Sequence, residues 1–291
     1  MKILLTGKTG QVGGELNNTL RDMGELVSVE REQLDLSKID SIEPAVLAIQ
    51  PDIIINAAAY TAVDKAEKEP DLAMTVNGVA PGVLAKSAKK IGASLIHYST
   101  DYVFDGRSET PYREEDATCP LSIYGESKLA GEKAIAEAGI PYLIFRTSWV
   151  YSLQGNSFLR TIKKLATEKD TLRIVDDQIG APTWAGSIAL ATHKIIEQCL
   201  RNRAKLSLSG VFHLTCQGQS SWHDFAKEIL NLSDASQNTQ LLPIPTSDYP
   251  TPATRPLYSL LSNDKSEKAF SFKMPHWNDA LKDCISSTPT I

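Results

Sequence analysis

The sequence predicts an α/β fold, a Rossmann-type doubly wound parallel sheet with a smaller C-terminal lobe. Two observations support this. A short apolar segment at residues 2–6 runs directly into a glycine-rich turn and then into an amphipathic segment. Apolar runs of strand length then alternate with helix-like segments as far as residue 150. Alternating strands and helices specify a parallel sheet with right-handed crossovers.

The turn after the first predicted strand has glycines at positions 7, 10 and 13. In such units the first glycine allows a tight turn, the second lets backbone approach a pyrophosphate, and the third lets the helix pack on the strand. The N-terminus of the following helix offers free N–H groups to phosphates. We therefore expect a dinucleotide-binding turn formed by Gly7, Gly10, Gln11, Val12 and Gly13.

Glu30 and Arg31 follow a second predicted strand at residues 26–29. A carboxylate at this point accepts the ribose 2′-OH of NAD, whereas an arginine can hold the 2′-phosphate of NADP. Because both residues are present, the sequence does not decide between NADH and NADPH. Asp35 and Leu36, just before the next predicted helix, are assigned to the same cofactor site.

The third predicted strand, residues 52–56, contains the apolar run Ile53-Ile54-Ile55, as expected for a central parallel strand. Ala58, Ala59 and Tyr60 follow it and are expected beside the cofactor, because ligands of doubly wound sheets bind outside the carboxyl ends of the strands. The next elements predicted are a helix at 71–91 with a loose patch at 78–82, and strands at 93–98 and 142–147.

Beyond residue 150 the pattern becomes mixed. We predict that residues 1–150 form the dinucleotide-binding domain, with 172–200 returning to it, and that 151–171 and 201–291 form the second lobe. Ser221 is the expected N-cap of a helix. The other predictions are helices at 156–168, 185–200, 221–232 and 277–285, strands at 172–175 and 211–215, and an extended loop at 243–256.

The composition argues against several classes of partner. The 291 residues carry a formal net charge of -5, which disfavours nucleic acid or an anionic membrane as the main partner. No apolar run reaches membrane-spanning length, and no leader pattern precedes the first strand. The four cysteines are widely spaced, as is typical of reduced thiols in cytoplasmic proteins. The five histidines, including His97, show no ligand or triad spacing and are interpreted as structural.

Tyr124 and Lys128 are the candidate catalytic pair. They are four residues apart in a predicted helix and so lie on one face of it. An ammonium group near a phenol lowers the phenol pKa from about 10 toward the working range. Thr100 follows the strand at 93–98 and reaches the same sheet edge. A hydride-donating cofactor needs a proton donor, so Tyr124 would protonate a carbonyl, Lys128 would also hold the nicotinamide ribose, and Thr100 would hydrogen-bond the developing oxyanion.

The chain resembles the extended short-chain dehydrogenase/reductases over essentially its whole length. The stretches Thr100-Asp101-Tyr102-Val103-Phe104 and Tyr249-Pro250-Thr251-Pro252-Ala253 indicate a group of reductases acting on dTDP-activated keto sugars. The remaining stretches that carry the resemblance are residues 7–13, 56–59, 62–67, 97–99, 124–132, 146–151, 177–183 and 254–256.

The resemblance implies an NADPH- or NADH-dependent reduction of the C4 ketone of dTDP-4-dehydro-6-deoxy-L-mannose, which gives dTDP-L-rhamnose, the last step in the synthesis of that sugar nucleotide. It also implies that Arg255 reaches the diphosphate, for which a guanidinium is suited. The other residues that it assigns to the substrate are Val63, Thr100, Asp101, Tyr102 and Trp149.

Some members of this family are dimers with magnesium held by glutamates at the subunit contact. Glu15 matches one of those positions. Trp184 and its neighbours, however, offer no carboxylate where another ligand is expected. We therefore predict no metal as a required part of the site, and a homodimer is possible.

Two other classes of function stay open. A dehydratase or 4-epimerase of the same fold is one; a dehydratase would have a glutamate where this chain has Tyr102. A non-catalytic dinucleotide-binding module is the other, because a regulatory subunit of a eukaryotic methionine adenosyltransferase resembles the same reductases. The intact set of Thr100, Tyr124 and Lys128 favours an enzyme.

Overall fold

The computed structural model describes residues 1–201, 209–233 and 239–287, and its centre is one parallel sheet. The six strands lie in the order β10-β5-β4-β3-β1-β2, and every neighbouring pair is parallel. The predicted α/β fold with a doubly wound parallel sheet is therefore confirmed. The strands are β1 Lys2–Thr6, β2 Glu25–Val29, β3 Ile53–Asn56, β4 Ser94–Thr100, β5 Tyr142–Thr147 and β10 Gly210–His213.

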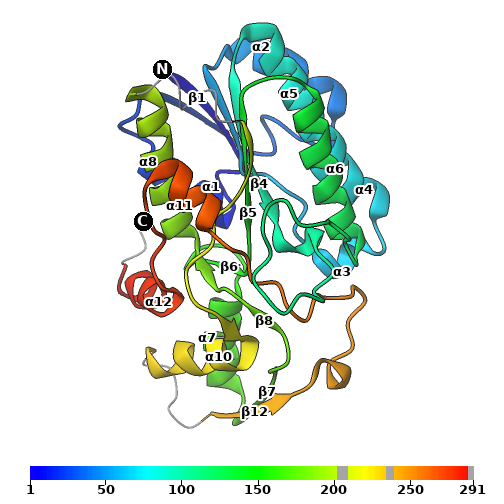
Figure 1. The fold of residues 1–291 in the computed structure, drawn as a ribbon, viewed down its shortest axis with the longest axis vertical. Helices are drawn as coiled ribbons and strands as arrows, with labels where there is room; N and C mark the ends of the chain where they lie inside the picture. Colours follow the sequence, from blue (N-terminus) through cyan, green and yellow to red (C-terminus); the bar gives the residue numbers. More distant parts are fainter. Residues whose placement is uncertain (202–208, 234–238, 288–291) are drawn as a thin grey trace.

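Helices cover both faces of the sheet (Figure 1). On one face lie α1 (Gln11–Thr19) and α8 (Ala185–Arg201), packed on Ile3, Leu5 and Phe145. On the other face lie α2 (Ile39–Ile49), α5 (Ala80–Ile91) and α6 (Ile123–Glu137), packed on Leu4, Ile54 and Ile144. Successive strand residues thus point to opposite apolar layers, which explains why the central strands are apolar throughout.

The strand order places a crevice at the carboxyl edge of the sheet. β1 pairs with β2 on one side and with β3 on the other, so the direction of winding reverses at β1. In doubly wound sheets ligands bind outside the strand ends at such a switch point. The second lobe lies at this same edge, below the sheet in Figure 1.

Residues 71–91, expected to form one helix with a loose patch, form a continuous helical segment in which one turn is π-helical instead of α-helical. It consists of α4 (Pro70–Met74), a π-helical turn at Thr75–Val79 and α5. The wider turn lets the chain continue into Pro81, which lies at the start of α5 and lacks an N–H donor. A short helix that the sequence did not predict, α3 (Val63–Ala66), precedes it.

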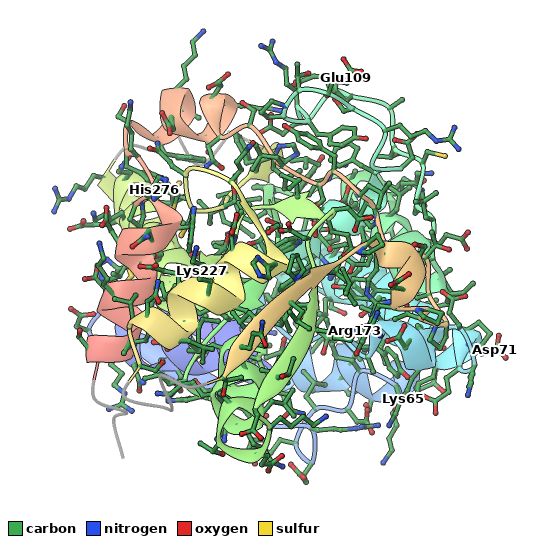
Figure 2. The ribbon with its side chains drawn as sticks, turned by 90° about the horizontal axis from the view of Figure 1, so that it is seen from below. Lys65, Asp71, Glu109, Arg173, Lys227 and His276 are labelled. Carbon is green, nitrogen blue, oxygen red and sulfur yellow. The ribbon has the colours of Figure 1, made fainter. Side chains whose placement is uncertain are left out.

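The second lobe is built from small paired strands and helices. β7 (Thr171–Val175) pairs in parallel with β12 (Gln240–Ile244), and Arg173 forms an ion pair with Asp248 beside them. Viewed from below, these strands and the lobe's helices lie in front of the sheet domain (Figure 2). The remaining elements are α7 Phe158–Glu168, α10 Trp222–Asn231, β6 Val150–Tyr151 with β9 Thr183–Trp184, β8 Ile179–Gly180 with β11 Ser220–Ser221, and α12 Trp277–Ser286.

Several segments differ from their expected places. Residues 210–213, assigned from the sequence to the second lobe, form β10 and pair with β5 in the main sheet. Residues 171–175 pair with β12 and not with the main sheet. Short segments gave weak signals, so β12 and α11 (Asp264–Phe270) were not predicted.

The division into two lobes stays a proposal, and its predicted second part includes residues 202–208, 234–238 and 288–291, which lie outside the described residues. Among the residues that the structure does describe, none of the helices has the length and apolar character needed to cross a membrane.

Candidate active site

The glycine turn fits a dinucleotide pyrophosphate. Gly7 has a φ of 75°, and a Cβ added to it would come within 2.7 Å of the Ala58 backbone nitrogen. A Cβ on Gly13 would overlap the carbonyl oxygen of Gly7. The turn is closed by a hydrogen bond from the Gly10 N–H to the Gly7 oxygen, at 2.9 Å. Only glycine permits this approach between β1, α1 and the loop after β3.

The N-terminus of α1 carries a free positive dipole end. Its N-cap is Gly10, which has no side chain to cap the helix, and its first turn contains no acidic residue. The N–H groups there can therefore bind a phosphate. Gln11, the first residue of α1, donates a side-chain hydrogen bond to the Asn156 carbonyl oxygen at 3.0 Å, which connects this turn to the second lobe.

Two ion pairs occupy the edge where the adenosine ribose is expected. Lys8 lies 3.1 Å from Glu30, and Arg31 lies 3.4 Å from Asp35. Hydrogen bonds from Ser37 lower the pKa of Asp35, so this carboxylate stays charged. Leu36 is buried beneath them. The structure therefore places both a carboxylate and cations at the end of β2, as the sequence indicated.

The loop after β3 is held in place by the π-helical turn. Buried Asn77, inside that turn, accepts a hydrogen bond from the Tyr60 N–H at 2.8 Å and donates one to the Tyr60 oxygen at 3.0 Å. It also donates to Ser127 on α6 at 3.1 Å. The backbone that carries Ala58, Ala59 and Tyr60 is thus fixed relative to the helix that carries Tyr124. The sequence gave no sign of this role for Asn77.

The predicted proton donor lies beside the predicted oxyanion partner. Thr100 ends β4, and its side chain lies close enough to the Tyr124 phenol to lower its pKa. Thr100 also donates to the Asp101 carboxylate at 3.0 Å. The rings of Tyr102 and Tyr124 meet edge to face at 5.6 Å. Thr100, Asp101, Tyr102 and Tyr124 therefore form one cluster, and Lys128 lies one turn further along α6.

The start of α6 is fixed by two caps. Ser122 accepts from the Gly125 N–H at 3.3 Å, and Glu67 accepts from the Ile123 N–H at 2.9 Å. A Cβ on Gly125 would overlap the Tyr102 carbonyl oxygen. The glycine after Tyr124 therefore lets α6 approach the loop that follows β4, and this brings the phenol to Thr100.

The electrostatics of the pair differ from the expected ones. The pKa of Tyr124 is raised to about 12, first because burial disfavours the phenolate and further because of the Asp101 charge. The Lys128 amine donates instead to the Tyr98 carbonyl oxygen at 2.6 Å and lies 3.1 Å from His97 Nε2. Burial lowers the pKa of Lys128 to about 8. Tyr124 is thus a neutral phenol, and Lys128 does not lower its pKa in this arrangement.

A polar row crosses the sheet at the level where β1 and β3 end. Thr6, Asn56 and His97 occupy paired positions on β1, β3 and β4. Thr6 donates to Asn56 at 2.7 Å, and Asn56 lies 3.0 Å from His97 Nδ1. Sequence reasoning interpreted His97 as a core histidine and missed its link to Lys128. The available signal was a polar residue directly after the apolar run of each of these strands.

A buried ion pair supports the row from the other side. Arg146 of β5 contacts the Glu132 carboxylate of α6 at 2.7 Å, and Ser99 donates to the same carboxylate at 2.5 Å. All three side chains are buried. Because removing one partner would leave an uncompensated buried charge, the pair fixes α6 against β4 and β5.

Arg255 is brought to the site by a contact between distant segments. Its guanidinium binds the Asp64 carboxylate through two hydrogen bonds, at 3.0 and 2.8 Å. Asp64 lies next to half-buried Val63 at the start of α3, and Arg255 lies close enough to Tyr102 to influence its pKa. Arg255, the residue predicted to bind the diphosphate, therefore lies near the tyrosine cluster. Its guanidinium is paired with the Asp64 carboxylate in this structure.

Trp149 packs against an aromatic side chain of the predicted second lobe. It has a φ of 47° and stacks on Trp222 with ring centroids 3.6 Å apart. A Cβ on Gly180 would contact the Trp149 ring at 2.5 Å. Trp222, which the sequence analysis did not assign to the site, in turn donates to Gln178 at 3.1 Å. The two indoles form an aromatic wall contributed by both parts of the chain.

Two of the carboxylates with metal-ligand chemistry already accept a hydrogen bond from a serine. Glu15 is half-buried, accepts from Ser152 at 3.3 Å, and has a pKa raised by burial. Asp176, His223 and Asp224 each bring one ligand atom within 4.8 Å of the others. Asp176, however, already accepts from Ser221, the N-cap of α10. The absence of a required metal stays a prediction.

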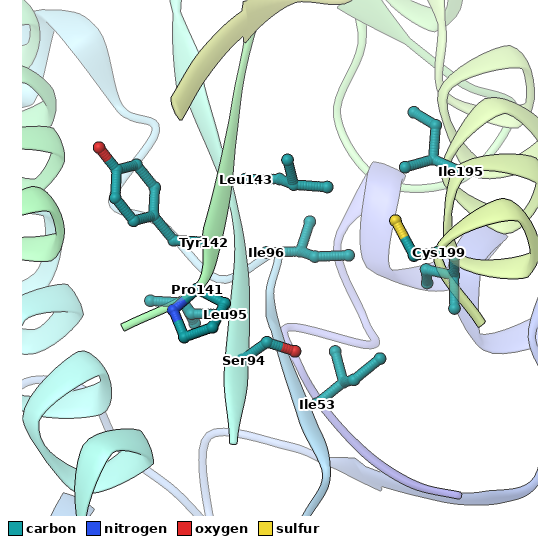
Figure 3. Close-up of a pocket in the computed structure, with 10 residues that line it drawn as sticks. Ile53, Ser94, Leu95, Ile96, Pro141, Tyr142, Leu143, Ile195 and Cys199 are labelled. Carbon is teal, nitrogen blue, oxygen red and sulfur yellow. The ribbon is translucent and has the colours of Figure 1, made fainter. Parts of the chain in front are cut away.

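A small hollow lies at the opposite, amino edge of the sheet (Figure 3). It measures about 30 Å³ and is lined mainly by apolar side chains such as Ile53, Leu143 and Ile195. Its size admits no more than a water molecule or two, and among the described residues its lining contains no carboxylate, lysine, arginine or histidine. It is therefore not the reaction site.

Together these features define the class of protein. A glycine turn with an open helix N-terminus, next to a threonine, a tyrosine and a lysine at the same strand ends, is the arrangement of a short-chain dehydrogenase/reductase. The sequence model of the family described as "RmlD substrate binding domain" matches residues 1–289, and the chain belongs to this family.

Similar proteins cover nearly the whole chain. A dTDP-4-dehydrorhamnose reductase of Burkholderia thailandensis is 47% identical over 292 residues, with 98% of each chain covered. One of Escherichia coli K12 is 43% identical over 294 residues, with 98% of this chain and 97% of the relative covered. The crystal structure of dTDP-4-dehydrorhamnose reductase from Bacillus anthracis in complex with NADP has a TM-score of 0.92 and 34% identity, with 99% of each chain covered.

Asp101 gives the site a pH-dependent stability. Burial raises the pKa of this carboxyl from 3.8 to about 6. Between those values the folded chain binds the proton more tightly than the unfolded chain, so stability falls as pH rises. We predict that Asp101→Asn, which cannot ionise, raises Tm by roughly 2–4 °C at pH 7.5 and has little effect at pH 4.

Asp105 supplies the matched control, because the Tyr112 hydroxyl lowers its pKa. Asp105→Asn is expected to lower Tm at pH 7.5, the opposite sign. Thermal unfolding of both variants at the two pH values decides the point. An equal shift of Asp101→Asn at both pH values would contradict this account.

Proposed function

We propose that the protein reduces the C4 ketone of dTDP-4-dehydro-L-rhamnose to dTDP-L-rhamnose with NADPH or NADH. The observation that carries this proposal is the contact between Thr100 and Tyr124 at the carboxyl edge of the sheet, beside the glycine turn. The relatives named above support the choice of substrate. By the same reasoning the chain serves the synthesis of rhamnose-containing polysaccharides, in the cytoplasm.

Tyr124 is the proposed proton donor. Its pKa of about 12 keeps the phenol protonated at neutral pH, so the proton is available for the substrate oxygen. The nicotinamide cofactor, when bound, supplies the hydride that is added to C4. Transfer of the phenolic proton to O4 completes the alcohol and leaves a phenolate, which takes a proton back from solvent. Thr100 donates a hydrogen bond to O4 as negative charge develops there.

Binding groups surround this centre. Lys128 has three N–H donors and directs two at β4 groups, which leaves one for the nicotinamide ribose. Val63, Asp101, Tyr102 and Trp149 are proposed to line the sugar site. The Arg255 guanidinium is proposed to release the Asp64 carboxylate when substrate binds and to pair with the substrate diphosphate instead. A diphosphate presents paired oxygens, as a carboxylate does.

The cations at the end of β2 favour NADPH over NADH. Arg31 keeps 72% of its side-chain surface exposed and approaches Asp35 through Nε at 3.4 Å, while Lys8 approaches Glu30 across the turn. A 2′-phosphate would give both cations a doubly charged partner. Glu30 can still accept a ribose hydroxyl, so we propose that NADH is also used, with lower efficiency.

The rival functions are less well supported. A dehydratase would need a second acid beside Thr100, and the neighbouring positions hold Asp101, which already accepts from Thr100, and Tyr102. A protein that only binds the dinucleotide would not need a proton donor such as Tyr124 placed beside the Thr100 hydroxyl. A homodimer, and a site that works without metal, remain parts of the proposal.

The proton donor is tested by Tyr124→Phe. We expect kcat for NADPH oxidation with enzymatically prepared dTDP-4-dehydrorhamnose to fall at least ~100-fold, the usual size of a general-acid contribution. Tyr142→Phe is the control, because Tyr142 lies at the amino end of β5, by the hollow at the far edge. A Tyr124→Phe enzyme as fast as wild type would remove Tyr124 from this role.

The cofactor preference is tested by Arg31→Ala. Loss of a charged hydrogen bond to the 2′-phosphate should lower kcat/KM for NADPH roughly 10-fold and that for NADH less than ~2-fold. Arg21→Ala is the control, since Arg21 bonds Asn17 and Asn18, away from the turn. An equal loss of kcat/KM with the two cofactors would show that Arg31 does not bind the 2′-phosphate.

A further inference from the structure

We propose that His97 is a positioning residue, whose Nε2 holds the Lys128 amine in place for the reaction and whose own orientation is fixed by Asn56. The assignment of a task to Lys128 rests on the proposed function. The contact between His97 and Lys128 does not, because it exists in the chain without any ligand.

The geometry consists of a continuous line of hydrogen bonds across the sheet. Thr6 of β1 contacts Asn56 of β3 at 2.7 Å, Asn56 contacts His97 Nδ1 at 3.0 Å, and His97 Nε2 contacts Lys128 at 3.1 Å. No member of the line exceeds 2% exposure. Thr6 directly precedes Gly7, so the line joins the dinucleotide turn to the lysine beside the proton donor.

His97 is held neutral, which is what this position requires. Burial, and then the nearby Lys128 charge, lower its pKa well below the usual value. A neutral imidazole has one N–H and one lone pair. In the orientation that the structure records, the Asn56 NH2 group faces Nδ1 and the Asn56 oxygen accepts from Thr6. When Lys128 is charged, Nε2 must accept, so Nδ1 carries the hydrogen and the Asn56 amide turns over to present its oxygen. When Lys128 is neutral, every hydrogen in the line reverses, and the amide presents its NH2 group.

Both arrangements keep every side chain in its place, because the two orientations of an amide occupy the same space and only its oxygen and nitrogen exchange positions. With a pKa of about 8, Lys128 can change its proton near neutral pH without leaving its place. Without Nε2, the amine would keep only the Tyr98 carbonyl as a fixed partner. Glu132, one turn along α6, could not replace it, since that carboxylate is already bound by Arg146 and Ser99.

Two amide substitutions of His97 distinguish the effect of its hydrogen bond to Lys128 from the effect of losing the volume of its ring. His97→Gln can place an amide oxygen near the Nε2 position, whereas the shorter His97→Asn reaches only the Nδ1 position. We expect His97→Asn to lose kcat roughly 10- to 100-fold, the effect of one hydrogen bond to a charged group. His97→Gln should recover to within ~3-fold of wild type, and neither change should move the KM for the dTDP sugar more than ~2-fold.

His213 is the matched control. It is fully buried on β10, and its Nδ1 donates to the Ser262 carbonyl oxygen at 3.1 Å instead of contacting Lys128. His213→Asn is expected to lower Tm while leaving kcat within ~2-fold of wild type. Equal kcat losses for His97→Asn and His97→Gln, or no loss in either, would overturn the proposal.

The contact itself is tested without turnover. Nitrogen-15 NMR of the histidine rings in the cofactor-free protein should show that Lys128→Met shifts Nε2 of His97 and leaves the His213 ring unchanged. An unshifted His97 would overturn the contact. If wild type failed to oxidise NADPH but the NMR shift were present, the proposed function would fail while the contact stood.

Discussion

The burial of Lys128 is the constraint on which the rest of the site depends. An ammonium group with 2% exposure is costly to place in a protein interior unless fixed partners surround it. The partners here are the Tyr98 carbonyl oxygen and the His97 ring, both on β4. They are in place because the parallel register sets Thr6 and Asn56, the last residues of β1 and β3, level with His97 inside β4.

The same packing fixes the neighbours of Lys128. The Glu132–Arg146 pair and the Asn77 hydrogen bonds hold α6 against β4, β5 and the loop after β3. Tyr124 consequently reaches Thr100 with a phenol that stays protonated. Two oppositely tuned groups result, a tyrosine with a raised pKa and a lysine with a lowered one, and such environments are typical of acid–base sites.

Much of the fold was accessible from the sequence, because strong local patterns determine it. The glycine turn, the apolar strands and the helix carrying Tyr124 and Lys128 gave the α/β architecture and brought Thr100 to the right edge. What the sequence could not supply were pairings across long separations. Three such pairings are the entry of residues 210–213 into the main sheet, the Arg255–Asp64 ion pair and the Trp149–Trp222 stack. In each case the local sequence pattern of one segment does not indicate which other segment it contacts. The expected effect of Lys128 on the Tyr124 pKa failed for the same reason, since β4 groups that bind the amine come from elsewhere in the chain.

The most direct test of the central claim follows the hydride. Purified protein would be given dTDP-4-dehydrorhamnose and NADPH that carries deuterium at the transferring C4 position, and the sugar product would be analysed by mass spectrometry and proton NMR. The account predicts dTDP-L-rhamnose with one deuterium at its C4, formed in equal amount to the NADP produced. Binding of the cofactor without any labelled sugar would contradict it, and would leave the chain as a dinucleotide-binding module.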